Sequence, residues 1–286
     1  MPNRTEPHLS SPDGGGSGGP YTSTIGFRQI SAAANHTCGI DWHGEIRCWG
    51  EPLDPPPPGG FEQLSTGSGF TCGLTAGVGM ISCTANSTLE QTKPPGTFYH
   101  LTAGNAHACA RRVDGSVVCW GDNQYGQAAS PSGVYQQVSA GGDRTCVLGL
   151  DDVVVCWGAG IAMPKKAGHT FTRISTGSLR SCGARDDISA ISCWDPTTGV
   201  DVDTEPGKLT ETGMFLDVDT GLSHVCAGNF SVVCWGTDAL GQSVAPQGSL
   251  MGVTSGTAHA CALGNSFPDQ RVVCWGDNTY GQANPP

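Results

Sequence analysis

Fourteen cysteines are the residues of this chain with the widest chemical range, because thiolates bind metals, exchange electrons or form structural disulfides. In chain order they fall into seven pairs whose members are 8 to 13 residues apart. The pairs are Cys38 with Cys48, Cys72 with Cys83, Cys109 with Cys119, Cys146 with Cys156, Cys182 with Cys193, Cys226 with Cys234, and Cys261 with Cys274. None of them has the Cys-x-x-Cys spacing of a zinc knuckle.

The residues between paired cysteines favour disulfides. Asp114-Gly115, a strong hairpin-turn dipeptide, lies midway in the third pair, and His43-Gly44 lies midway in the first. Cysteines placed symmetrically about a hairpin turn face each other on neighbouring strands, close to the distance that a disulfide needs. We therefore predict one disulfide for each pair, with reduced buried thiols and a metal site as the alternatives. Each closed loop of about ten residues stabilises the fold by roughly 2.5–3 kcal/mol.

The cysteine pairs must be positioned by a repeated element, because their first members recur every 34 to 44 residues. Each copy opens with a phrase such as "FRQISAAANHTC" or "YQQVSAGGDRTC", in which apolar and polar residues alternate as in half-buried strands. Glycine, at 43 of 286 residues, has about twice its usual share. This pattern predicts an all-β, seven-bladed β-propeller of seven repeats of about 36 residues, each with one intrablade disulfide. The repeats start near residues 27, 61, 98, 135, 171, 215 and 250.

The rest of the chain sets the domain organisation and excludes some partners. Residues 1–24 are rich in Pro, Gly and Ser and predict a disordered lead, whereas residues 25–286 predict one propeller. We find no signal peptide in this chain and no apolar run for membrane insertion. The net charge of −11 disfavours nucleic acid. The acidic stretch 195–219 predicts a solvated loop, with calcium binding as an alternative, and we expect no cofactor or metal and a monomer.

The repeats resemble the regulator-of-chromosome-condensation repeat family. The resemblance rests on the "SAG"-type phrase, "HACAL" (His259 to Leu263), the Val-x-Cys-Trp-Gly strand and "GDNxYGQ" in repeats three and seven. It implies a seven-bladed propeller, in agreement with the cysteine count. Repeat two departs from the family because it ends "ISCTANS" without Trp-Gly. The paired cysteines resemble extracellular relatives rather than the nuclear exchange factors, so nuclear activity is not carried over and a secreted protein is expected.

The repeated Trp and His residues are interpreted as structural, so binding residues are sought where the repeats differ. Hairpin tips between paired cysteines carry aromatic and arginine side chains, which protein interfaces favour. The candidate partner-binding residues are Trp42, His43, Arg111, Arg112, Phe230 and Phe267. We therefore predict a secreted, non-catalytic propeller that binds a protein. The alternatives are a lectin, for which Asn123 with Tyr125 and Asn278 with Tyr280 are a weak signal, and a propeller enzyme, for which no distinct catalytic set stands out.

Overall fold

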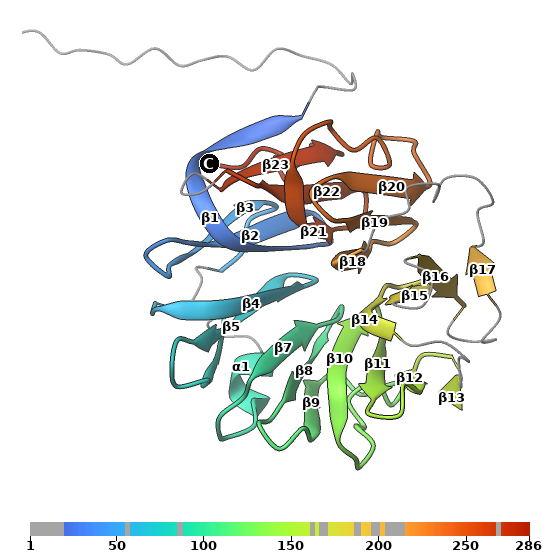
Figure 1. Ribbon diagram of the computed structural model, residues 1–286. Helices are drawn as coiled ribbons and strands as arrows, with labels where there is room; N and C mark the ends of the chain where they lie inside the picture. Colours follow the sequence, from blue (N-terminus) through green and yellow to red (C-terminus); the bar gives the residue numbers. More distant parts are fainter. Residues whose placement is uncertain are drawn as a thin grey trace, which may run out of the picture.

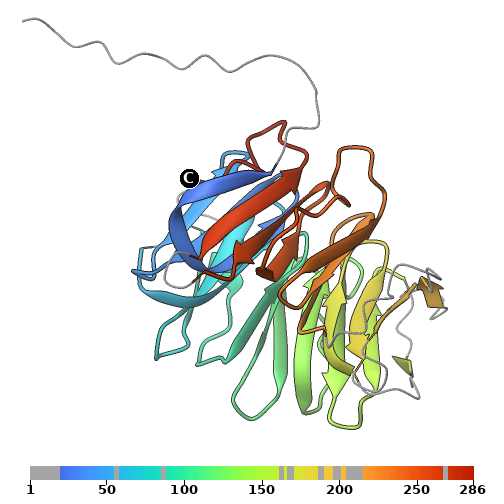
Figure 2. The same cartoon turned by 45° about the horizontal axis from the view of Figure 1, so that its top comes forward.

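Seven antiparallel blades, one per repeat, form a ring in the computed structural model (Figure 1), and a shared strand joins the first and last blades into one six-stranded sheet. The structure describes residues 20–54, 58–84, 88–160, 164–165, 171–185, 190–195, 201–203, 215–266 and 270–286. The first strands of successive blades contact one another in a closed circuit, which Figure 2 shows from a tilted direction. The predicted all-β, seven-bladed propeller is therefore confirmed.

Each blade is built from three consecutive strands that alternate in direction. The first strands are β1 (Tyr21–Ala33), β4 (Phe61–Gly67), β7 (His100–Ala103), β10 (Tyr135–Gly141), β14 (Phe171–Thr176), β18 (Asp217–Thr220) and β21 (Leu250–Ser255). The second strands are β2 (His36–Asp41), β5 (Phe70–Thr75), β8 (His107–Arg111), β11 (Arg144–Gly149), β15 (Ser181–Arg185), β19 (His224–Gly228) and β22 (His259–Gly264). The third strands are β3 (Ile46–Gly50), β6 (Ile81–Cys83), β9 (Val117–Gly121), β12 (Val154–Gly158), β16 (Ile191–Trp194), β20 (Val232–Gly236) and β23 (Arg271–Gly276).

A few further elements complete the blades. Short fourth strands β13 (Pro164–Lys165) and β17 (Asp201–Asp203) pair with β12 and β16. The helix α1 (Thr88–Thr92) follows blade 2, and its Leu89 packs into the core. Among the described residues, no helix is long and apolar enough to cross a membrane.

Strand β1 closes the ring because it belongs to two blades. Its first part, from Tyr21 to Gly26, pairs with β23 as the outer strand of blade 7, and its second part pairs with β2 as the inner strand of blade 1. The lead predicted for residues 1–24 is therefore too long, since Tyr21–Thr24 lie in a strand. Local sequence could not reveal this strand because its partner lies about 250 residues away in the chain. Residues 1–19 lie outside the described part.

The seven predicted disulfides are present, one in each blade. They join Cys38 to Cys48, Cys72 to Cys83, Cys109 to Cys119, Cys146 to Cys156, Cys182 to Cys193, Cys226 to Cys234, and Cys261 to Cys274. In every blade the two cysteines are directly opposed on the second and third strands, with Cα atoms 3.9 to 4.2 Å apart.

The oxidised state of the cysteines decides between the alternatives left open by their spacing. All fourteen cysteines lie in the described part of the chain, and none of them is free. All fourteen cysteines are therefore in disulfides in this structure, as the turn positions predict. A chain with one disulfide per blade suits an oxidising compartment.

The core lies between blades rather than in one central mass. One cluster joins Cys109 and Val117 of blade 3 to Val138, Val147 and Trp157 of blade 4. Trp157, which follows the second cysteine of blade 4, thus packs against blade 3. In the same way, Trp49 of blade 1 packs against blade 7. Because each blade supplies half of two clusters, the blades stabilise one another around the ring.

Candidate functional site

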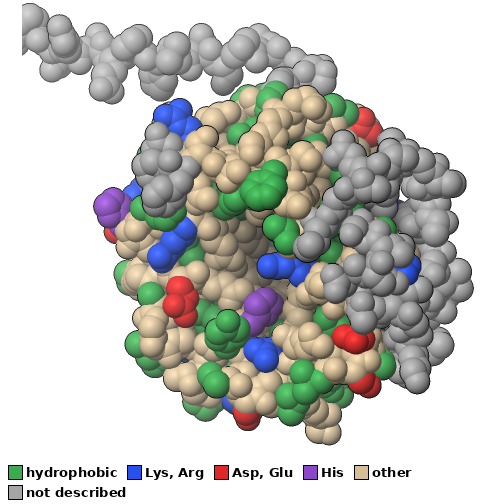
Figure 3. All heavy atoms as spheres, viewed as in Figure 1, with side chains coloured by type: hydrophobic (Ala, Val, Ile, Leu, Met, Phe, Trp, Pro, Cys, Tyr) green, Lys and Arg blue, Asp and Glu red, His purple; other side chains and the backbone are tan. Residues whose placement is uncertain are grey.

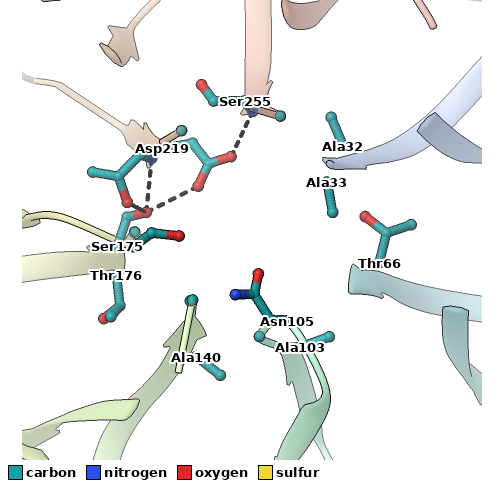
Figure 4. A pocket seen from close by; sticks show the side chains of 18 of the residues that line it. Ala32, Ala33, Thr66, Ala103, Asn105, Ala140, Ser175, Thr176, Asp219 and Ser255 are labelled. Atoms are coloured by element: carbon teal, nitrogen blue, oxygen red, sulfur yellow. Dashed lines mark hydrogen bonds between the residues drawn. The ribbon is translucent and has the colours of Figure 1, made fainter. Parts of the chain in front are cut away.

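The centre of the ring is a channel lined by the first strands of all seven blades. At one end it contains a cavity of about 150 Å³, lined mainly by Ser, Thr, Ala and Gly. Figure 4 shows small side chains such as Ala103, Ala140 and Thr66 around this space, with Asp219 as the charged one among the labelled residues. Small uncharged side chains make this end a poor catalytic site, because they offer no general acid or base beyond Asp219.

A ring of hydrogen bonds joins neighbouring blades along the channel. In each of these bonds a side-chain oxygen on a first strand accepts a bond from a backbone N–H in the first strand of the next blade, as Ser139 Oγ does from Thr176 N at 2.9 Å. The accepting residues are Ser31, Thr102, Ser139, Ser175, Asp219 and Thr254. In blade 6 the acceptor is Asp219, whose carboxylate accepts bonds from Ser255 N at 2.7 Å and Ser175 Oγ at 2.9 Å (Figure 4). Burial raises the pKa of this carboxyl.

A second set of bonds lies two residues earlier in the same strands. Gln137 spans from blade 4 to blade 5, because its Nε2 donates to Ile174 O at 2.9 Å and its Oε1 accepts from Ile174 N at 2.8 Å. Gln29 and Gln63 make the same pair of bonds to Leu64 and Leu101. We use the name glutamine ring for the seven residues, one in each blade, that occupy the position of Gln29 in the first strand.

The glutamine ring is interrupted at four blades. The corresponding residues are His100, Arg173, Asp217 and Gly252. Burial, together with the positive charges of Arg111 and Arg173, lowers the pKa of His100 to about 4. Burial also raises the pKa of Asp217 to about 7, although 29% of its side chain is exposed toward the channel, while Arg173 at 3.7 Å opposes the rise. Ionisable groups thus replace bridging amides at three of these four positions.

The histidines that precede the first cysteines are structural. His107 Nε2 lies 2.8 Å from Thr145 Oγ1 in the next blade, and His259 Nε2 lies 2.8 Å from Thr37 Oγ1. His36 and His224 are equally buried. Burial lowers the pKa of His36, His107 and His224 to about 4 and that of His259 to about 3. In the described part of the chain, no group of three or more His, Cys, Asp or Glu could hold a metal ion.

The Asp-Asn-x-Tyr-Gly-Gln tails are also used internally. Asn123 Oδ1 accepts a bond from Ala128 N and Asn278 Oδ1 one from Ala283 N, both at 3.0 Å. The carbonyl of Gln127 accepts the Trp157 indole N–H at 2.9 Å. The Asn side chains that a lectin would need are therefore already bonded within their own tails, while the Tyr125 and Tyr280 rings are exposed. This arrangement gives no support to the lectin alternative.

The candidate partner-binding residues that the structure describes lie in the turns between second and third strands, or, for Arg111, at the end of a second strand. We use the name hairpin-tip face for these turns together with the starts of the first strands. Trp42 is 43% exposed and Phe230 56% exposed, and His43 is exposed beside Trp42. Phe230 has a φ of 60°, a left-handed conformation that is costly for a bulky side chain. Phe267 lies outside the described residues, as does most of the acidic stretch 195–219.

Arg111 and Arg112 are half-buried and hold neighbouring aromatic residues. Arg111 Nε donates to Tyr135 O at 2.7 Å, and its guanidinium lies 5.8 Å from the centre of the Tyr99 ring. The Arg112 guanidinium lies 5.2 Å from the centre of the Phe98 ring. These arginines therefore join the start of a first strand to a hairpin tip and so shape the surface between blades 3 and 4.

Sequence reasoning missed the apolar residues around these arginines. Tyr99 is 72%, Val113 80% and Leu150 67% exposed. Val134 and Leu150 line a groove of about 340 Å³, and Val134 packs over Gly115 at the tip that carries Val113. We name Tyr99, Arg111, Val113, Val134 and Leu150 the blade 3–4 patch. A signal existed in the sequence for Val113, Val134 and Leu150, since each is an apolar residue outside the repeated phrases.

Comparisons with known proteins agree with this architecture. Residues 98–127 match the family model described as Regulator of chromosome condensation (RCC1) repeat. The ectodomain of the Physcomitrella patens receptor kinase CR4 has 22% identity and a TM-score of 0.68, over 88% of this chain and 74% of that one. The CRINKLY WD40 ectodomain of Arabidopsis thaliana ACR4 has 24% identity and a TM-score of 0.66, over 93% and 99%.

A yeast protein shares the same fold at lower identity. Prp20p from Saccharomyces cerevisiae is 14% identical with a TM-score of 0.62, over 89% of this chain and 83% of that one. The repeat match, the seven blades and these neighbours agree with the resemblance drawn from the repeated phrases. Residues 98–127 thus match an RCC1 repeat, and the chain has a propeller fold similar to that of these proteins.

Proposed function

We propose that this protein is an exported, non-catalytic propeller whose hairpin-tip face binds another protein, with the blade 3–4 patch at the centre of the contact. The observation that carries the proposal is the contrast between two classes of residue. The repeated polar residues bond to neighbouring blades, whereas apolar side chains in the variable loops are exposed next to one another.

The composition of the patch supports a protein partner. Aromatic residues and arginine are enriched at the centres of protein interfaces, where they supply contact area at low entropic cost. Arg111 is already fixed by Tyr135 O and by the Tyr99 ring, so less side-chain entropy is lost on binding. A groove beside the patch gives an apolar side chain of the partner a place to enter.

Relatives with this fold give further support. Yeast Prp20 binds proteins, namely Gsp1p, histones and Kap60. The two plant propellers are ectodomains of receptor kinases, which places propellers of this fold outside the cell. Seven disulfides fit the same location for this chain.

The test compares two triple variants. In the first, Tyr99, Val113 and Leu150 are each changed to Ser; in the matched control, the similarly exposed Tyr125, Leu240 and Tyr280 of the opposite face are changed to Ser. Oxidised protein is used as bait for surface and secreted proteins of its source, and the affinity for a retained protein is measured. We expect the patch variant to bind at least about 100-fold more weakly, since hot-spot residues contribute about 2 kcal/mol or more each.

The control should bind as the unchanged protein does. Equal affinity of the patch variant, or loss of affinity in the opposite-face control alone, would show that the hairpin-tip face is not the interface. Both variants must first show the melting temperature of the unchanged protein, which is expected because the changed side chains are on the surface.

A further inference from the structure

Two of the fourteen cysteines are only partly buried, and in both blades the third strand is the last strand of its sheet among the described residues. They are Cys48 of blade 1 and Cys119 of blade 3, whereas the other twelve cysteines are buried. A thiolate can exchange with a disulfide only where it can reach one of the two sulfurs. The Cys38–Cys48 and Cys109–Cys119 disulfides are therefore the candidates for exchange with an external thiol.

A hydroxyl group distinguishes the disulfide of blade 1 from that of blade 3. Thr71 Oγ1 of blade 2 lies 3.2 Å from Cys38 Sγ. Because a disulfide sulfur carries no hydrogen, the Thr71 hydroxyl is the donor of this bond. At the same position in blade 4, Thr145 Oγ1 lies 3.7 Å from Cys109 Sγ. The sulfur of Cys38 thus has a closer hydroxyl donor than the sulfur of Cys109.

The Thr71 hydroxyl can bond to sulfur because blade 1 departs from the repeat. The hydroxyl of Thr145 lies 3.1 Å from the carbonyl of Gln127, in the tail of the preceding blade, and 2.8 Å from His107 Nε2. Blade 1 has no Asp-Asn-x-Tyr-Gly-Gln tail, and the buried Nε2 atom of His36 has no hydrogen-bond partner. Neither bond of Thr145 therefore has a counterpart at Thr71.

We propose that the Cys38–Cys48 disulfide is a thiol-exchange site. The thiolate of an external thiol attacks Cys48 Sγ and forms a mixed disulfide with it, while the bond to Cys38 breaks and Cys38 leaves as a thiolate. Attack on Cys38 itself is blocked, since this residue is fully buried. The Thr71 hydroxyl donates a hydrogen bond to the departing thiolate, and a stabilised thiolate leaves faster.

A second molecule of the thiol completes the exchange. Its thiolate attacks the external sulfur of the mixed disulfide, so two thiols are oxidised to one disulfide and Cys38 and Cys48 are reduced. Exchange opens the loop between the two cysteines, which carries Trp42 and His43 on the hairpin-tip face. The blade 3–4 patch has its own disulfide, so the inference does not depend on the protein-binding function proposed above.

The experiment uses 2-mercaptoethanol, a small neutral thiol, on the folded protein. Figure 3 shows acidic and basic side chains scattered among the others on one face, and a neutral reagent keeps their influence small. Reduction at mildly alkaline pH is stopped by acid at successive times, free thiols are alkylated, and peptides are analysed by mass spectrometry. We expect Cys38–Cys48 to react before the other six disulfides, with the mercaptoethanol adduct on Cys48 and the free thiol on Cys38.

Two variants test the role of the hydroxyl. Thr71→Val keeps the shape of the side chain but removes the donor, and we expect Cys38–Cys48 to be reduced about tenfold more slowly. Thr71→Ser keeps a hydroxyl and should restore most of the rate. The internal control is Cys109–Cys119 in the same molecules, whose rate should not change. A variant that failed to fold would show faster reduction of all seven disulfides, which is the opposite of the expected result.

Three results would each overturn the proposal. They are reduction of Cys38–Cys48 no faster than that of the other disulfides, an adduct on Cys38 instead of Cys48, and equal rates in the valine and serine variants. The experiment involves no partner protein, so each of these results would leave the protein-binding function standing.

Discussion

The bonds of the glutamine ring predict a measurable loss of stability when Gln137 is replaced by leucine. The amide of Gln137 makes two hydrogen bonds to the backbone of Ile174 at 2.8 and 2.9 Å, and they join blade 4 to blade 5. Leucine has a similar volume but neither a donor nor an acceptor. The backbone N–H and C=O of Ile174 would then lose their side-chain partner and face an apolar group.

The expected magnitude follows from the two bonds. Each neutral hydrogen bond contributes about 1 kcal/mol, and the freed backbone groups keep partial access to channel water, so we expect a loss of about 2 kcal/mol. For a chain of this length that corresponds to a melting temperature lower by roughly 4–8 °C. The propeller should remain closed because the hydroxyl bonds of the channel and the pairing of β1 with β23 are unchanged.

The assay is thermal unfolding of the oxidised protein at pH 7, followed by near-ultraviolet circular dichroism. Gln124→Leu is the control, since Gln124 is exposed in a surface loop, and it should change stability by less than about 0.5 kcal/mol. If both variants melted at the same temperature as the unchanged protein, the bonds of Gln137 to Ile174 would carry no stability.

Two further predictions concern buried and strained groups. Burial lowers the pKa of His224 to about 4, against about 6.5 in the unfolded chain. Between these two pH values the unfolded chain binds more protons than the folded one. The free energy of unfolding therefore falls as the pH drops from 6.5 to 4, by up to about 1.4 kcal/mol per pH unit. His224→Phe places at this position the residue that blade 2 has at Phe70, and it should reduce the dependence of stability on pH in urea titrations at pH 7, 6 and 5. Asp217, whose pKa is raised, changes stability with pH in the opposite direction. Its contribution is the same in both proteins and cancels when they are compared. Phe230→Gly should raise the free energy of unfolding by about 1 kcal/mol, because glycine adopts a positive φ without strain, and an unchanged or lower urea midpoint would contradict this.

The sequence predicted the parts of this fold that repeat. Paired cysteines about a hairpin turn require opposed positions on two strands, and Cys109 and Cys119 are opposed as the Asp114-Gly115 turn indicates. Seven periods of such units leave few architectures other than a radial one. The outer strand of blade 7 was not predictable in this way, because pairing between Tyr21 and Cys274 depends on closure of the whole ring.

The candidate site was predicted only in part. Hairpin tips could be located from the cysteines, so Trp42 and Phe230 were placed on an exposed face from sequence alone, and both are exposed. Tyr99 and Val134 precede strands in the chain, and their proximity to the tips depends on how adjacent blades are set against each other. The role of Gln137 was hidden for the same reason, since the alternating pattern identifies it as a polar strand residue but not as a bond between blades.

The shared strand β1 has a consequence for the order of events during biosynthesis. Each disulfide joins cysteines at most 13 residues apart, so a hairpin can be oxidised soon after it leaves the ribosome or translocon, without waiting for its neighbours. Residues Tyr21–Gly26, by contrast, are made before all the other strands of the propeller, and they have no partner until β23 emerges. Oxidation of each hairpin can therefore proceed along the chain one blade at a time, whereas ring closure must wait for β23, and during that interval the edge of the first segment is open to other extended chains.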